Sequence, residues 1–203
     1  MRNALVDMDA SGSLARNGYC LLPDIVAPGD AGAVAVEARA LAMSARRVVG
    51  DYYCVNDDRS ISSPRRLSTV AAGPLLLAIH RDARLLELLE HIAARRLCPS
   101  RSSYIYYTPG DYIGLHKDAA ACQVTLITSI TGALDPLVVH PSLIDVPPEE
   151  LVEISRTHSA MPPGGTRVAV PKAGIFLMLR GSTIPHHRPA ALDPRTIAAL
   201  CYR

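Results

Sequence analysis

Residues 122–130 read Cys-Gln-Val-Thr-Leu-Ile-Thr-Ser-Ile, a run of apolar and β-branched residues that is typical of a β-strand. Similar short runs recur between residue 100 and the end of the chain, at 104–107, 136–140, 167–170, 174–179 and 195–202. Turns that contain Gly or Pro separate most of them. Many short strands at this spacing predict a sandwich, barrel or jelly roll.

The N-terminal half has a different pattern. Residues 18–26 predict a short strand, and Pro28 begins an Ala-rich stretch that predicts a helix to about Arg47. Residues 50–70 are polar and rich in turn formers, which indicates a long loop. A second helix is predicted after Asp82, a suitable N-cap, because leucines recur on one stripe of the following turns.

We therefore expect a mainly β protein with N-terminal support helices, an α+β class with a jelly-roll core. The 203 residues fit one domain over 1–203, with the strand, helices and loop of about 1–99 supporting a core of about 100–203. Hydrophobic residues make up 49% of the chain, which is enough to build a sizeable core.

Charge and composition exclude several classes of protein. The formal net charge is +2 with both signs dispersed, so no nucleic-acid footprint is expected. No run of eighteen apolar residues and no signal-like N-terminus is present, which predicts a cytoplasmic protein without a membrane span. The five cysteines are odd in number, scattered and without a CxxC pair, so we expect reduced thiols at all five positions.

The segment His116-Lys-Asp118 is the first candidate site. In a strand, residues i and i+2 point to the same face, so an imidazole and a carboxylate would converge there as two metal ligands. An HxD pair alone is a weak signal, because such pairs are also common on surfaces.

A histidine pair strengthens the prediction. His186 and His187 follow an apolar run and a turn, 70 residues beyond His116, which is far enough for intervening strands to return the chain to the HxD pair. Two histidines and one carboxylate on one face leave coordination positions open, as in non-haem Fe(II) oxygenases. Calcium or magnesium would take more oxygen ligands, and structural zinc a closed fourth ligand.

Arg195 completes the pattern. It lies nine residues beyond His186, at the start of the last predicted strand, where a guanidinium could bind a carboxylate in a bidentate manner. Arg65 and Arg66 could anchor a substrate anion, although such a pair more often lies on a solvated surface. The histidines at 80, 91, 140 and 158 show no ligand spacing, and His140 and His158 are expected in polar loops or at the rim.

From Tyr104 to the C-terminus, the chain resembles the Fe(II)/2-oxoglutarate-dependent oxygenases, in their prolyl-hydroxylase-like style. The matching segments are Tyr107-Thr-Pro-Gly-Asp-Tyr-Ile-Gly-Leu-His116-Lys-Asp118, the Thr-rich run 122–130, residues 164–174, and Pro185-His186 to Arg195. The resemblance implies a double-stranded β-helix core, with His116, Asp118 and His186 as ligands of Fe(II). It also implies that Arg195 and Tyr107 bind the distal carboxylate of the co-substrate 2-oxoglutarate, with O₂ as oxidant.

Some assignments stay open at this level. His187 is the alternative third ligand, although His186 gives the spacing of nine to Arg195 and follows Pro185. Tyr106 or Tyr104 are alternatives to Tyr107. The long polar segment 132–164 is expected as an insert over the site or at its rim.

The activity implied by the resemblance is a dioxygenase that oxidises an unactivated C–H bond of a small molecule, an amino acid or a secondary-metabolite intermediate. Because a halogenase of this kind would carry a small residue in place of Asp118, hydroxylation or a related oxidation is favoured. The alternatives are a protein or peptide prolyl hydroxylase and a non-catalytic, cupin-like metal-binding module.

Overall fold

The computed structural model describes residues 7–22, 25–51, 63–132, 135–157, 162, 164–170 and 174–203. The strands are β1 (Tyr19–Leu22), β2 (Arg46–Asp51), β3 (Pro64–Ala71), β4 (Pro99–Tyr107), β5 (Tyr112–His116), β6 (Val124–Thr131), β7 (Asp135–Val139), β8 (Thr166–Val170), β9 (Phe176–Leu179), β10 (His186–Arg188) and β11 (Arg195–Tyr202). The helices are α1 (Asp7–Asn17), α2 (Pro28–Leu41), α3 (Pro74–His80), α4 (Ala83–Ala93) and α5 (Pro148–Thr157), with short 3₁₀ turns at Ala42–Ser44 and Pro141–Leu143.

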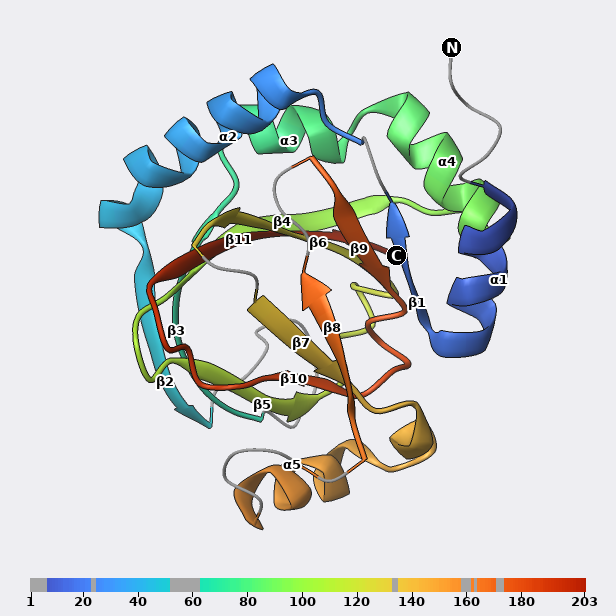
Figure 1. The fold of residues 1–203 in the computed structure, drawn as a ribbon, viewed down its shortest axis with the longest axis vertical. Coiled ribbons are helices and arrows are strands. Elements are labelled where there is room, and N and C mark those ends of the chain that lie inside the picture. The colour runs from blue at the N-terminus through green and yellow to red at the C-terminus, as the bar shows by residue number, and fades with distance from the viewer. Residues whose placement is uncertain are drawn as a thin grey trace.

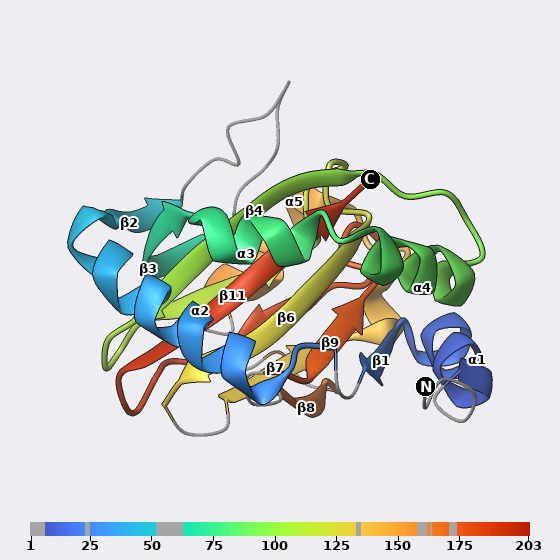
Figure 2. The ribbon, with the colours of Figure 1, turned by 90° about the horizontal axis from the view of Figure 1, so that it is seen from above.

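The strands form one antiparallel sheet in the order β1-β9-β6-β11-β4-β3-β5-β10-β7-β8, and β2 pairs with β3 outside this path. The sheet curls so that β5, β10 and β7 lie opposite β4, β11 and β6 (Figure 1). Helices α2, α3 and α4 cover the outer face of the larger layer, while α5 lies against the smaller one (Figures 1 and 2). This is the predicted jelly-roll core with N-terminal support helices.

Two apolar cores hold the layers together. Strand residues alternate between them, because successive side chains point to opposite faces of a sheet. Leu126 of β6 packs outward with Leu14 of α1 and Leu89 of α4, whereas the next residue, Ile127, packs inward with Leu177. The inner core fills the space between the two layers. Any site between the layers must therefore lie beside this core.

Helix α4 confirms the second predicted helix and its N-cap. The Asp82 carboxylate accepts hydrogen bonds from the backbone N–H groups of Arg84 and Leu85, at 2.9 and 3.1 Å. The buried stripe Leu85, Leu89 and Ile92 packs against the sheet. Ala94, with φ 52°, ends the helix in the left-handed region.

The N-terminal predictions were partly wrong. The helix that begins at Pro28 ends at Leu41 instead of Arg47, because 46–51 pairs as strand β2 along β3, with Val48 opposite Leu67. The predicted loop 50–70 contains strand β3 from Pro64, and residues 52–62 lie outside the described part. Helices α1 and α3 were not predicted from the sequence.

The cysteine prediction also needs correction. Cys122 and Cys201 form a disulfide, with Cα atoms 4.6 Å apart and a sequence separation of 79. Strands β6 and β11 are neighbours, so the fold brings together two thiols that no local motif connects. Cys20 and Cys98 are free thiols, and Cys54 lies outside the described residues.

Among the described residues, no helix is long and apolar enough to cross a membrane. The single-domain boundary and the cytoplasmic location stay predictions.

Candidate metal centre

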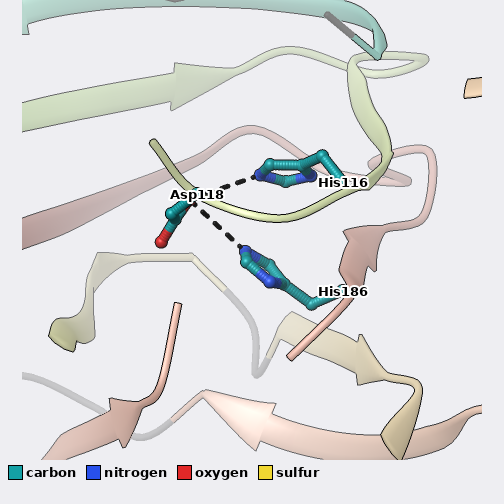
Figure 3. Close-up of side chains that lie close together, drawn as sticks. All are labelled: His116, Asp118 and His186. Carbon is teal, nitrogen blue, oxygen red and sulfur yellow. Dashed lines mark ion pairs between the residues drawn. The ribbon is translucent and has the colours of Figure 1, made fainter. Parts of the chain in front are cut away.

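Three of the predicted site residues meet where β5 and β10 pair. His116 is the last residue of β5, His186 is the first of β10, and the two are register partners in the antiparallel ladder. Asp118 lies two residues beyond the end of β5, in a segment without regular structure, so the path of that segment, and not strand alternation as predicted, directs its carboxylate toward the histidines. Figure 3 shows the carboxylate facing both imidazole rings.

The ligand atoms are close enough to bind one ion. Each of His116, Asp118 and His186 offers a ligand atom within 4.8 Å of the other two. The Oδ1 atom of Asp118 lies 3.5 Å from His116 Nε2 and 3.7 Å from His186 Nε2 (Figure 3). Zn–N, Zn–O and similar metal–ligand bonds are about 2 Å long, so an ion among the three atoms would need only small shifts.

Backbone carbonyls set the orientation of both histidines. His116 Nδ1 lies 2.8 Å from the Gly114 carbonyl, and His186 Nδ1 lies 2.9 Å from the Ile184 carbonyl. A carbonyl only accepts, so each Nδ1 carries the proton and donates it. Each Nε2 is then left with a lone pair that faces Asp118, which is the arrangement that metal-binding histidines usually show.

The Asp118 carboxylate is fixed by its own contacts. Its Oδ2 accepts a hydrogen bond from Thr125 Oγ1 at 2.7 Å, and its backbone N–H donates to the Gly181 carbonyl at 2.8 Å. A side chain at Gly181 would overlap Asp118 Oδ2 and lie 2.7 Å from Thr125 Oγ1. The space above the carboxylate therefore requires glycine at this position.

The protonation states also suit a metal. Burial and the neighbouring His116 lower the pKa of His186 to about 4. Burial opposes ionisation of Asp118, but the nearby His186 and His116 hold the pKa of its carboxyl below the usual range. His186 and Asp118 thus present deprotonated ligand atoms near neutral pH, as metal binding requires.

His187 points away from the three candidate ligands. Its Nδ1 lies 3.0 Å from His140 Nε2, and both side chains are buried. The structure therefore brings His186, and not His187, to the HxD pair. His140 was expected in a polar loop or at the rim; it is fully buried, because it packs against His187 and beside Gly165. His158 lies outside the described residues.

The two residues predicted to bind 2-oxoglutarate lie side by side. Arg195 of β11 is the register partner of Tyr107 of β4. Burial raises the pKa of the Tyr107 hydroxyl, and burial lowers the pKa of Arg195, although Tyr107 acts in the opposite direction. Tyr104 and Tyr106 point to the other face, where their hydroxyls donate to Glu37 at 2.7 Å and to the Ala38 carbonyl at 2.6 Å. Of the three tyrosines, Tyr107 is thus the one that faces the interior.

Arg188 is an interior residue that the sequence reasoning missed. It follows His186 by two positions, is 2% exposed, and holds its guanidinium carbon 5.3 Å from the centre of the Tyr107 ring. Its position in a strand two residues after a ligand could have predicted this placement. Of the Arg65–Arg66 pair, Arg66 is half exposed and lies 3.4 Å from the Asp111 carboxylate, and Arg65 donates to the Ser63 carbonyl.

Solved structures with the same arrangement of elements identify the fold. The epimerase SnoN of nogalamycin biosynthesis, described in complex with Fe³⁺, α-ketoglutarate and nogalamycin RO, superposes with a TM-score of 0.68 at 16% identity, over 96% of this chain and 82% of SnoN. The chain has the fold of the Fe(II)/2-oxoglutarate oxygenases. HygX from Streptomyces hygroscopicus, described with nickel, 2-oxoglutarate and hygromycin B bound, gives 0.65 at 15% identity over 96% and 86%. A Pseudomonas putida prolyl-4-hydroxylase gives 0.60 at 14% identity over 96% and 97%.

Neither a family model nor a curated protein sequence matches the chain. The structural likeness confirms the predicted fold. The roles of the individual residues are instead inferred from the geometry of the site.

Proposed function

We propose that this protein is an Fe(II)- and 2-oxoglutarate-dependent dioxygenase that oxidises an unactivated C–H bond of a small molecule. The observation that carries the proposal is the convergence of His116 Nε2, Asp118 Oδ1 and His186 Nε2 in the oxygenase fold. Two imidazoles and one carboxylate form the ligand set that non-haem Fe(II) oxygenases use, because it leaves positions open for a co-substrate and O₂.

The residues present fit these groups. His116, Asp118 and His186 would hold the iron, and the carbonyl contacts of both Nδ1 atoms keep the ring orientations fixed. Arg195 and Tyr107 would bind the distal carboxylate of 2-oxoglutarate, since a guanidinium and a hydroxyl at adjacent register positions can donate to one carboxylate. With O₂, this centre supplies the oxidising power for C–H cleavage, and the co-substrate leaves as succinate and CO₂.

The carboxylate at position 118 bears on the type of oxidation. Because Asp118 would itself be a metal ligand, hydroxylation or a related oxidation is favoured over halogenation. The protein's contribution is to orient the target C–H bond and to keep other oxidisable groups and water away from it.

A small-molecule substrate is supported by two observations. SnoN and HygX, which share the fold, are described with nogalamycin RO and hygromycin B. A cavity of about 1100 Å³ also reaches Asp118 in this chain. Peptide hydroxylation stays the alternative, because a prolyl-4-hydroxylase has the same fold.

Anaerobic addition of Fe(II) and 2-oxoglutarate tests the proposal. We expect a visible metal-to-ligand charge-transfer band in the wild-type protein. Asp118→Ala should lose the band because the metal is lost, whereas Arg195→Ala should recover it at higher 2-oxoglutarate concentration. A wild-type protein without the band would contradict the proposal, and a band unaffected by Arg195→Ala would contradict the role of Arg195 alone.

A further inference from the structure

A cavity of about 1100 Å³ lies beside the metal centre, and the residues proposed to bind 2-oxoglutarate do not line it. Its walls are α1, the C-terminal end of α4, the segment that follows Asp118 and the turn 180–183. Figures 1 and 2 show α1 and α4 next to each other at one end of the sheet. Asp118 forms part of the wall, so the cavity reaches one of the three candidate ligands. Its volume is slightly above the usual range of about 300–1,000 Å³ for small-molecule sites.

The walls carry three basic side chains and one acidic side chain. His91 and Arg95 come from the end of α4, and Arg180 from the turn. Over the described ranges, neither arginine side chain has an ion pair or a hydrogen bond, and Asp118 is the acidic residue among the lining residues. The neighbouring Arg96, by contrast, pairs with Glu90 at 3.1 Å. Of the two arginines that follow α4, Arg96 is thus paired with Glu90, whereas Arg95 lines the cavity.

The remaining lining is mixed. Ala15, Ala94 and Ala120 provide the exposed apolar surface of the lining. Ser11, Ser182 and Thr183 add hydroxyl groups that can donate or accept. A few polar groups on an apolar wall are typical of a site that orients a small organic molecule.

We propose that this cavity is the substrate site and that the substrate carries an anionic group, a carboxylate or a phosphate, which Arg95 and Arg180 bind. The apolar part of the substrate packs against Ala15, Ala94 and Ala120, and the bond to be oxidised faces the metal centre at Asp118. The inference rests on the proposed function, because it assigns the substrate of that same metal centre. It concerns a second anion, because the proposed anchors of 2-oxoglutarate, Tyr107 and Arg195, do not line this cavity.

A pair of fluorescent probes tests the anion preference directly. 1-Anilinonaphthalene-8-sulfonate and N-phenyl-1-naphthylamine share their aromatic body and differ by one sulfonate. Each is titrated into Zn(II)-loaded protein with saturating 2-oxoglutarate at constant ionic strength. The variants are Arg95→Gln, Arg180→Gln, the cavity-filling Ala15→Phe and, as a matched control, Arg81→Gln, which removes an exposed arginine outside the cavity.

We expect the sulfonate probe to bind the wild type more tightly than the neutral probe. Arg95→Gln and Arg180→Gln should each weaken the sulfonate probe about tenfold and leave the neutral probe unchanged, because one charge-assisted contact is lost. Ala15→Phe should weaken both probes, and Arg81→Gln neither. Competition by inorganic phosphate at lower concentration than acetate would indicate a phosphate, and the reverse order a carboxylate.

Equal affinity for the two probes, equal losses in Arg81→Gln, no effect of Ala15→Phe, or competition by neither anion would overturn the inference. These outcomes are independent of the iron chemistry. A wild type that lacks the charge-transfer band contradicts the proposed function, whereas unchanged probe binding in both arginine variants contradicts the anionic substrate.

Discussion

Gly181→Ala should disable the metal centre while leaving the fold in place. A Cβ at this position would lie 2.7 Å from Thr125 Oγ1 and would overlap Asp118 Oδ2. The backbone cannot retreat freely, because the Gly181 carbonyl accepts the hydrogen bond of Asp118 N–H at 2.8 Å. The carboxylate must therefore move by about 1 Å to restore an ordinary carbon–oxygen contact of about 3.3 Å. Its hydrogen bond with Thr125 is broken by the same shift.

The expected loss of metal affinity is about 10- to 100-fold, the range that follows when the orientation of a metal ligand is lost. Calorimetric titration of the metal-free protein with Mn(II) measures it, and circular dichroism checks the fold. Gly73→Ala is the matched control, because its Cβ would lie 2.5 Å from the Glu37 carboxyl carbon, far from the centre in the fold. Wild-type Mn(II) affinity in folded Gly181→Ala would refute this reasoning, as would an equal loss in Gly73→Ala.

Three further predictions concern the third ligand, the disulfide and a buried histidine. His186→Ala should lower Mn(II) affinity by more than about 100-fold while His187→Ala changes it far less, and the opposite order would make His187 the ligand. Cys201→Ser should lower the free energy of unfolding by about 2–4 kcal/mol in urea, because the Cys122 link closes a long loop; an unchanged urea midpoint would show that the link does not form. Burial lowers the pKa of His80 below 6.5, so the unfolded chain takes up a proton that the folded chain excludes. Stability, fully present above about pH 6.5, should therefore fall as the pH drops below it, and this fall should be smaller in His80→Gln; urea midpoints at pH 7.5 and 5.5 measure both.

The C-terminal strands could be predicted because their turns are local signals. Gly and Pro separate apolar runs, and each run is long enough to show its β preference without knowledge of its partner. The N-terminal half depends on long-range pairing instead. The first residues of β2 belong to the stretch for which the sequence predicts a helix. They form a strand because β2 pairs with β3, with Val48 opposite Leu67. Such pairing is invisible to a local pattern.

The candidate ligands could be predicted from the order of His, Asp and His along the chain. Their arrangement in space could not be predicted in this way. His186 and His187 are chemically identical in the sequence, and only the register of β10 against β5 directs His186 to His116. The pairing of β10 with β5 is irregular between His186 and Arg188. Regular strand alternation alone would therefore not have shown which of the two histidines faces His116. The disulfide is a similar case, because Cys122 and Cys201 meet only when β6 and β11 are neighbours.

The most direct test of the metal centre is a crystal structure of the protein grown anaerobically with Mn(II) and 2-oxoglutarate, with the ion located by its anomalous scattering. We expect one ion bound by His116 Nε2, Asp118 Oδ1 and His186 Nε2, and the distal carboxylate of 2-oxoglutarate at Arg195 and Tyr107. An ion at the His140–His187 pair, or no anomalous peak among the three proposed ligands, would contradict the account.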